Sequence, residues 1–158
     1  MSIADELSYR LDLPADTFEL STARTDKAVT GKVLRDAGIE VADQKIVMSQ
    51  NDALSFFDGL SSQDKAVVIK PTNSAGTDGV TLCRTRACVA AAVDSMLGKL
   101  NKLKRINENL LIQEYLTWTE YAVNTVSANG VHIVTDIWEY KRTPVDGAMN
   151  VYDADLFL

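Results

Sequence analysis

The sequence contains few of the residues that mark a metal-centred, secreted or membrane-spanning protein. It has a single histidine, His132, and two cysteines, Cys83 and Cys88, with four residues between them. These do not make a zinc site, and two free thiols in a reducing cytoplasm are expected. No apolar run approaches the length of a membrane span, and the first residues have neither the basic nor the apolar region of a secretion signal. We therefore expect a cytoplasmic protein.

Positive charge is also scarce. The chain has 16 lysine and arginine residues against 22 aspartate and glutamate residues, which gives a formal net charge of −6. This balance disfavours nonspecific binding to nucleic acid or to an anionic membrane surface. A chain of 158 residues with 46% hydrophobic content is long and apolar enough to bury a core, as one domain or as two small lobes.

The most informative stretch is residues 67–79. An apolar run of strand character ends on Lys70 and Pro71, a loop of small residues with two glycines follows, and strand character returns after it. This order predicts a flexible hairpin. Small side chains let backbone N–H groups approach an anion closely, and a lysine at the end of the strand adds a compact positive charge. The combination favours a lid over a polyphosphate.

Other glycine-rich phosphate loops fit this stretch less well. A Walker loop requires a lysine directly after its last glycine, and Val80 stands there instead. The dinucleotide fingerprint G-x-G-x-x-G at the start of a helix is absent as well. The alternative is an ordinary solvent-exposed hairpin with a lysine nearby by chance.

The remaining elements follow from apolar periodicity and from capping and turn residues. A helix over 23–37 would be capped by Ser21 or Thr22, and a helix over 86–103 would bury one apolar face that runs from Val89 to Leu100. This content predicts an α+β fold with largely antiparallel pairing. The other expected helices cover 3–11 and 51–58, and the expected strands cover 44–48, 67–71, 80–83, 110–114, 119–128 and 131–140.

The Asn129-Gly130 pair between the last two strands predicts a two-residue hairpin turn, which would fix the pairing register. With this register Glu120, Asn124 and Lys141 share one face near the open end. Glu120 would then oppose Glu139, which needs a cation or a hydrogen-bond donor such as Lys141 or the hydroxyls of a ribose. Alternatively, this is a solvated hairpin end. The expected pairs are Ala128 with Val131, Val126 with Ile133, Asn124 with Thr135, Ala122 with Ile137 and Glu120 with Glu139.

Five segments in this order resemble the ATP-grasp superfamily, over roughly residues 22 to 153. Their wording is most similar to that of dipeptide-type carboxylate–amine ligases, which join amino acids. The segments are Asp26-Lys27 opening a helix that ends in Ala37-Gly38-Ile39, then Val68-Ile69-Lys70-Pro71, then the loop from Asn73 to Val80, then Gln113-Glu114-Tyr115-Leu116 with Glu120-Tyr121, and then Asp136 to Lys141.

The resemblance implies a partial ATP-grasp fold, with two small α/β lobes and mainly antiparallel sheets. Residues 1–20 would be a helical lead-in from a preceding domain. Residues 21–114 would form the first lobe with the glycine-rich loop, and residues 115–158 the start of the second lobe.

The resemblance also implies roles for individual residues. Lys27 and Lys70 would hold the ATP phosphates, and Lys141 would face the γ-phosphate as the catalytic lysine. Glu120 would bind the ribose hydroxyls. The residues of the mobile lid would be Asn73, Ser74, Ala75, Gly76, Thr77, Asp78 and Gly79, and those along the adenine edge would be Gln113 and the backbones of Glu114 and Leu116.

The implied function is ATP-dependent amide-bond formation through an acylphosphate, with amino acids as substrates. The alternatives are a truncated, inactive nucleotide-binding module, or another branch of the superfamily, biotin carboxylase-like or purine-biosynthetic. Mg²⁺ is expected for the family, but its usual ligands come from a later part of such proteins. Asp153 and Asp155 do not match them, so no metal ligand is assigned. Weak or absent ligase activity and self-association through bare surface are expected for these residues alone.

Overall fold

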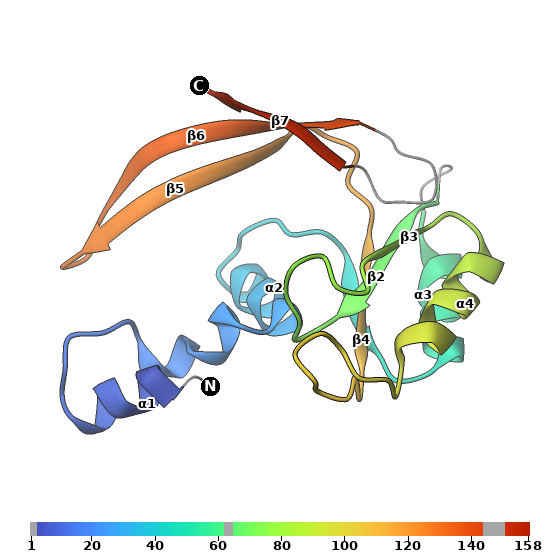
Figure 1. Ribbon diagram of the computed structural model, residues 1–158, viewed down its shortest axis with the longest axis horizontal. Coiled ribbons are helices and arrows are strands. Elements are labelled where there is room, and N and C mark those ends of the chain that lie inside the picture. The colour runs from blue at the N-terminus through green and yellow to red at the C-terminus, as the bar shows by residue number, and fades with distance from the viewer. Residues whose placement is uncertain (1–2, 62–64, 144–150) are drawn as a thin grey trace. The chain divides into compact units, whose positions relative to one another are not determined.

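The computed structural model describes residues 3–61, 65–143 and 151–158 (Figure 1). The chain divides into two compact units, Met1–Tyr115 and Leu116–Leu158, which we call unit 1 and unit 2. Each unit has its own sheet, and the strand pairs among the described residues are all antiparallel. The predicted α+β class with antiparallel sheets is therefore confirmed.

Unit 1 is built on a four-stranded sheet in the order β1-β4-β2-β3. The glycine-rich loop joins β2 to β3, which pair directly, so the predicted hairpin is confirmed. The strands are β1 (Gln44–Val47), β2 (Val67–Pro71), β3 (Thr81–Cys83) and β4 (Leu110–Glu114), and the helices are α1 (Ile3–Arg10), α2 (Lys27–Asp36), α3 (Gln50–Gly59) and α4 (Arg86–Met96), with short 3₁₀ turns at Phe18–Leu20 and Thr22–Arg24.

One face of this sheet forms the core with α3 and α4. Alternate residues of a strand point to opposite faces, so Val67 and Ile69 of β2 share this face with Leu110 and Ile112 of β4. All four are essentially fully buried against apolar side chains of the two helices. Cys83 belongs to the same core, where burial raises the pKa of its thiol to about 12. Cys83 and Cys88 are free thiols, as expected.

The opposite face carries the polar side chains. Lys70 of β2, Gln113 of β4 and Gln44 of β1 alternate with the core residues of their strands, and Gln44 and Gln113 are directly paired. Helix α2 lies on this side, since the Gln44 amide donates a hydrogen bond to the Ala28 carbonyl oxygen of α2 at 3.2 Å. We call this the polar face, although it also carries the buried apolar side chains of Val68 and Leu111.

Two helix predictions for unit 1 are wrong in their limits. Helix α2 begins at Lys27 and not at residue 23, because a 3₁₀ turn occupies Thr22–Arg24 and the Asp26 carboxylate caps the backbone N–H groups of Ala28 and Val29. Helix α4 ends at Met96, because Gly98 adopts a φ of +72° and turns the chain. Leu100, predicted to be buried, is 68% exposed and forms a bridge with Ile106.

Unit 2 is a three-stranded sheet in the order β5-β6-β7. Its strands are β5 (Glu120–Ala128), β6 (Val131–Thr143) and β7 (Val151–Phe157), and the last was not anticipated from the sequence. Asn129 and Gly130 have φ values of +51° and +76°, as a two-residue hairpin turn of this hand requires. The predicted turn and the pairs nearest to it, including Val126 with Ile133, are confirmed.

The register further from the turn differs from the prediction. Thr125 pairs with Val134, but Asn124 pairs with Asp136, so Thr135 is an extra residue in β6 and forms a β-bulge. One inserted residue exchanges the faces of every side chain beyond it. Glu120 therefore opposes Tyr140 and not Glu139, and the predicted pairs of Asn124 with Thr135 and of Ala122 with Ile137 are also wrong.

None of the helices in the described part of the chain combines the length and the apolar content that crossing a membrane requires.

Candidate functional site

Lys27 is held at the start of α2, beside the glycine-rich loop. Its backbone N–H donates to the Thr72 carbonyl oxygen at 3.2 Å, and its Nζ donates to the Ser74 carbonyl oxygen at 2.7 Å. The Asp26 cap fixes where the helix begins and therefore where this side chain starts. Lys27 and Ser74, two of the residues to which the resemblance assigns phosphate contacts, are thus brought together.

Lys70 lies next to them on the polar face of the sheet. Its Nζ donates a hydrogen bond to Gln113 Oε1 at 2.9 Å, and the side chain is half-buried. Burial lowers the pKa of Lys70, and the positive charge of Lys27 lowers it further. No described carboxylate forms an ion pair with either ammonium group. Two partly buried cations without a neutralising carboxylate favour the binding of an anion.

The glycine-rich loop is anchored by hydrogen bonds at both of its ends. Asp78 accepts one from the Ser74 hydroxyl at 2.6 Å and one from the Lys102 backbone N–H at 2.8 Å, while Asn101 Nδ2 donates to the Asn73 carbonyl oxygen at 3.2 Å. The bond from Lys102, followed by the bond from Ser74, lowers the pKa of Asp78. The loop ends are therefore fixed, while its tip at Ala75, Gly76 and Thr77 is exposed.

Gly79 is required at the end of this loop. Its φ is +64°, and a Cβ atom added there would lie 2.8 Å from the Met96 sulfur and 3.2 Å from Pro71 Cδ. Both the conformation and the crowding exclude a larger residue. Gly76 and Thr77 also have positive φ values, of +66° and +56°. The backbone is thus bent at an exposed loop tip, an arrangement that can present N–H groups to an anion.

Gln113 connects Lys70 to a residue that sequence reasoning missed. Its Nε2 donates to Gln44 Oε1 at 3.2 Å, while its Oε1 accepts the hydrogen bond from Lys70. Gln44 gave no sequence signal, because a glutamine at the first position of a short strand has many structural explanations. Its place beside Gln113 follows from the pairing of β1 with β4, which are far apart in the chain.

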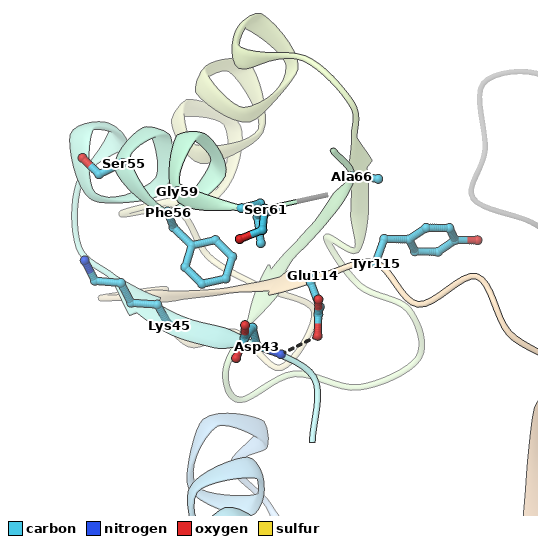
Figure 2. A pocket seen from close by; sticks show the side chains of 10 residues that line it. Asp43, Lys45, Ser55, Phe56, Gly59, Ser61, Ala66, Glu114 and Tyr115 are labelled. Atoms are coloured by element: carbon cyan, nitrogen blue, oxygen red, sulfur yellow. Dashed lines mark hydrogen bonds between the residues drawn. The ribbon is translucent and has the colours of Figure 1, made fainter. Parts of the chain in front are cut away.

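Glu114 points to the other face of the sheet from Gln113. Its Oε1 accepts a hydrogen bond from the Asp43 backbone N–H at 2.8 Å, and its own N–H donates to the Asp43 carbonyl oxygen at 2.9 Å (Figure 2). The carboxylate lines a pocket of about 460 Å³, into which the Phe56 side chain points. Lys27, Lys70 and the glycine-rich loop are not among the residues that line this pocket.

Within unit 2, Glu120 and Lys141 lie on opposite faces of the β5–β6 hairpin because of the bulge at Thr135. Lys141 forms an ion pair with Glu139, two residues earlier on the same face. The prediction that Glu120, Asn124 and Lys141 share one face is therefore wrong for Lys141, although Glu120 and Asn124 do share a face. Leu116 is exposed and precedes β5.

Chemically, the lysine pair and the loop can bind an anion with several oxygen atoms. Ammonium groups suit phosphate oxygens, and an exposed loop of small residues can add backbone N–H donors. Within the described residues, no three His, Cys, Asp or Glu side chains gather in a way that could hold a metal ion. The site therefore consists of cations and backbone donors from β2, α2 and the loop.

Comparison with protein families gives a match to the family described as phosphoribosylglycinamide synthetase, ATP-grasp (A) domain, over residues 25–150. Among characterised proteins, dapdiamide A synthase of Enterobacter agglomerans is 30% identical over 148 residues. That alignment covers 93% of this chain and 34% of the relative, so the chain spans about a third of the length of that protein.

Solved structures with the same fold include two enzymes whose names refer to amino acids. D-alanyl-alanine synthetase A from Vibrio cholerae superposes with a TM-score of 0.69 at 12% identity, over 98% of this chain and 46% of that one. The L-amino acid ligase from Bacillus licheniformis gives a TM-score of 0.67 at 17% identity, over 96% of this chain and 34% of that one. At these identities the similarity shows a shared fold.

Proposed function

Since the chain belongs to the ATP-grasp family, we propose that it is the ATP-binding portion of a ligase that forms an amide bond on amino-acid substrates. The observation that carries the proposal is the pair of Lys27 and Lys70. Their ammonium groups lie close enough for one to lower the pKa of the other, and neither has a described carboxylate partner. A triphosphate would supply the missing negative charge.

The glycine-rich loop supports this proposal. Lys27 already contacts the loop at the Ser74 carbonyl oxygen, so loop and lysine would approach the same phosphates. The residues that would cover the β- and γ-phosphates are the seven predicted from the sequence, Asn73 to Gly79. Their anchored ends and exposed tip suit a segment that closes over a ligand while remaining attached to unit 1.

The base and sugar contacts belong to the same proposal. Gln113 would contact the adenine amino group, the backbones of Glu114 and Leu116 would pair with the adenine edge, and Glu120 would bind the ribose. Lys141, expected from the resemblance to face the γ-phosphate, is left out of the proposed site, because it lies on the opposite face of the hairpin from Glu120 and pairs with Glu139.

The proposed chemistry begins with attack of a carboxylate on the γ-phosphorus of ATP, which yields an acylphosphate and releases ADP. An amine then attacks the acyl carbon, loses a proton and displaces phosphate to give the amide. Positioning and charge neutralisation dominate phosphoryl transfer, and both are what Lys27 and Lys70 would provide. Mg²⁺ belongs to the proposal for the whole ligase, but the described residues offer no cluster to hold it, so we place no metal ligand in this chain. The names of dapdiamide A synthase and the L-amino acid ligase support amino acids as substrates.

A second candidate is synthesis of a phosphoribosyl glycinamide, which the name of the matching family favours. The two candidates differ in the amine that receives the activated carboxylate. Phosphate release from ATP and Mg²⁺ in the presence of mixed amino acids would favour the first, whereas release that requires glycine with a phosphoribosylamine would favour the second. Release with neither, from a protein that binds ATP, would favour a nucleotide-binding module without catalysis.

Nucleotide binding is tested by calorimetric titration with ATP. We expect Lys70→Ala and Lys27→Ala each to weaken binding about tenfold or more, because each removes charge-assisted hydrogen bonds to phosphate. Lys45→Ala is the matched control, since Lys45 is exposed and lines the pocket in Figure 2 on the other side of the sheet. Absence of heat with the unaltered protein would contradict the proposal. If Lys45→Ala alone weakened ATP binding strongly, the nucleotide site would be assigned to that pocket.

A further inference from the structure

A continuous hydrogen-bond chain crosses the polar face of the unit 1 sheet and ends at Lys70. It runs from the Ala28 carbonyl oxygen through the Gln44 amide and the Gln113 amide to the Lys70 ammonium group, with donor–acceptor distances of 3.2, 3.2 and 2.9 Å. We infer that Gln44 is a positioning residue that holds Lys70, through Gln113, in the orientation required for phosphate binding. The inference rests on the proposed nucleotide function.

The direction of every bond in this chain is set by chemistry. An ammonium group only donates, so Gln113 must present its carbonyl oxygen to Lys70 and its NH₂ group to Gln44. Gln44 must then accept with its own oxygen, and its NH₂ group is left for the Ala28 carbonyl oxygen, which only accepts. If Gln113 turned over, its NH₂ group would face the ammonium group. Gln44 prevents that rotation and so keeps the acceptor oxygen on Lys70.

Gly31 makes room for this chain. A Cβ atom at Gly31 of α2 would lie 2.1 Å from Gln44 Nε2 and 2.7 Å from Gln44 Cδ. Gly31 lies inside the helix and its φ is not positive, so its backbone does not require glycine. Glycine in a helix interior is normally unfavourable relative to alanine. The passage of the Gln44 side chain explains why this position nevertheless lacks a side chain.

The charges around Lys70 explain why this hydrogen-bond chain matters for phosphate binding. Lys27 and Lys70 repel each other, and burial adds to the cost of the charge on Lys70. Gln113 Oε1 is the hydrogen-bond acceptor seen for Lys70 in the described residues. Without a fixed acceptor the ammonium group would turn away from Lys27 and toward water. The affinity for phosphate would then include the cost of returning it.

The first test compares Gln44→Met with Gln50→Met in calorimetric titrations with ATP. Gln50 is a control of the same type, because its amide bridges Asp94 and the Ala90 carbonyl oxygen on α4, outside the proposed site. We expect Gln44→Met to weaken binding about tenfold, as loss of a well-placed bond to a charged group does, and Gln50→Met to leave it unchanged. Equal affinities of Gln44→Met and the unaltered protein would overturn the inference.

A double-mutant cycle separates positioning from general damage. If Gln44 acts through Gln113, Gln44→Met should weaken ATP binding in the unaltered protein but have no further effect in a Gln113→Met background. Additive losses would show that Gln44 acts by another route and would overturn the inference.

Gly31→Ala perturbs the chain from the helix side without removing any of its polar groups. The added methyl group displaces Gln44, so ATP binding should weaken about as much as in Gln44→Met. The melting temperature should not fall, because alanine favours the helix. Gly59→Ala is the control, since nothing lies within 4 Å of a Cβ atom there. Normal ATP binding by Gly31→Ala would contradict the inference.

A measurement without nucleotide distinguishes failure of this inference from failure of the proposed function. The pKa of Lys70 can be followed by NMR through its ¹³Cε signal. We expect it to be higher in Gln44→Met and in Gln113→Met than in the unaltered protein, because the released ammonium group turns toward water and away from Lys27, which relieves both causes of its lowered pKa. An unchanged Lys70 pKa in Gln44→Met would overturn the inference even if ATP binds. A raised Lys70 pKa in Gln44→Met, without any ATP binding by the unaltered protein, would support the hydrogen-bond chain and contradict the proposed function.

Discussion

Unit 1 and unit 2 both contain strands with Val and Ile residues, but the two units differ in how far these residues are buried. In unit 1, β2 and β4 place Ile69 and Ile112 in a core closed by α3 and α4, where both side chains have no exposed surface. In unit 2, Val126 and Ile133 face each other across β5 and β6, yet they are 58% and 60% exposed. No described side chain of unit 2 is buried.

The difference shows that β-branched residues favour a strand but do not by themselves specify its burial. In unit 1 the helices that cover the sheet are short, capped by Ser49 and Thr85, and set in place by the chain segments between the strands. Unit 2 has no helix in its described residues, so ladder hydrogen bonds and cross-strand pairs hold its sheet. Unit 1 therefore contributes Lys27 and Lys70 to the proposed phosphate site from a sheet that is backed by a closed core.

The largest expected difference between the units is in the response to truncation of the same residue type. Ile112→Ala should reduce the free energy of unfolding by about 2–5 kcal/mol, because it opens a cavity in a closed core. Ile133→Ala should change it by about 0.5 kcal/mol or less, as exposed positions generally do. Denaturant unfolding followed by circular dichroism measures both. Similar losses for the two variants would mean that Ile133 is covered in solution.

Self-association would provide such a cover, and it is the next largest expected effect. The apolar residues exposed on β5 and β6 form a surface of the kind that promotes association. We expect the molar mass obtained from light scattering to rise with protein concentration. The double variant Val126→Glu, Ile133→Lys should weaken association about tenfold, because it replaces an apolar pair with an ion pair. Met48→Lys, a similar change at an exposed position of unit 1, is the control. A clean monomer at high concentration would contradict the expectation.

The smallest expected effects are those of low pH on two aspartates, one in each unit. Each unit has an aspartate with a pKa that is lowered by hydrogen bonds. For Asp78 these bonds come from Lys102 and Ser74. For Asp136 they come from Asn124, Thr135 and then Trp138. A lowered pKa means that the stabilisation is complete above the ordinary aspartate value of 3.8 and is lost as the pH falls through the lower folded value. NMR titration of both carboxyl carbons should give midpoints below 3.8.

Protonation should also have different local consequences in the two units. In unit 1 it should speed hydrogen exchange at the Lys102 amide, which Asp78 protects, and in unit 2 it should shift the indole N–H signal of Trp138, which donates to Asp136. Asp78→Ala should abolish the first response and leave the second. Loss of both responses in that variant would show that the aspartates are not independent.

Much of the fold could be predicted because its signals are local. The apolar run before Lys70, the small residues after it and the Asn129-Gly130 turn each act over a few residues, and the structure confirms the strands that they imply. The end of α4 could not be predicted from periodicity, since the apolar spacing continues to Leu100 while the backbone turns at Gly98. Strand β7 was missed because its short run of alternating residues stands close to the end of the chain.

The candidate site divides in the same way. Lys27, Lys70 and the loop were found because each lies at a recognisable position of an element. Gln44 and Gly31 were missed because their importance depends on the pairing of β1 with β4 and on the packing of α2, which join residues far apart in the sequence. The bulge at Thr135 left no pattern in the alternation of β6, so the assignment of Glu120 and Lys141 to one face failed.

The extra residue at Thr135 also determines how the hairpin would respond to saturation mutagenesis. Along β6, tolerance to polar substitution should alternate between odd-numbered and even-numbered residues, because these residues face opposite sides of the sheet. This alternation is interrupted at Thr135, so two even-numbered residues on either side of Thr135 lie on opposite faces of the sheet. Deletion of this single residue would restore a uniform alternation along β6, with Asn124 still opposite Asp136 and Glu120 still opposite Tyr140.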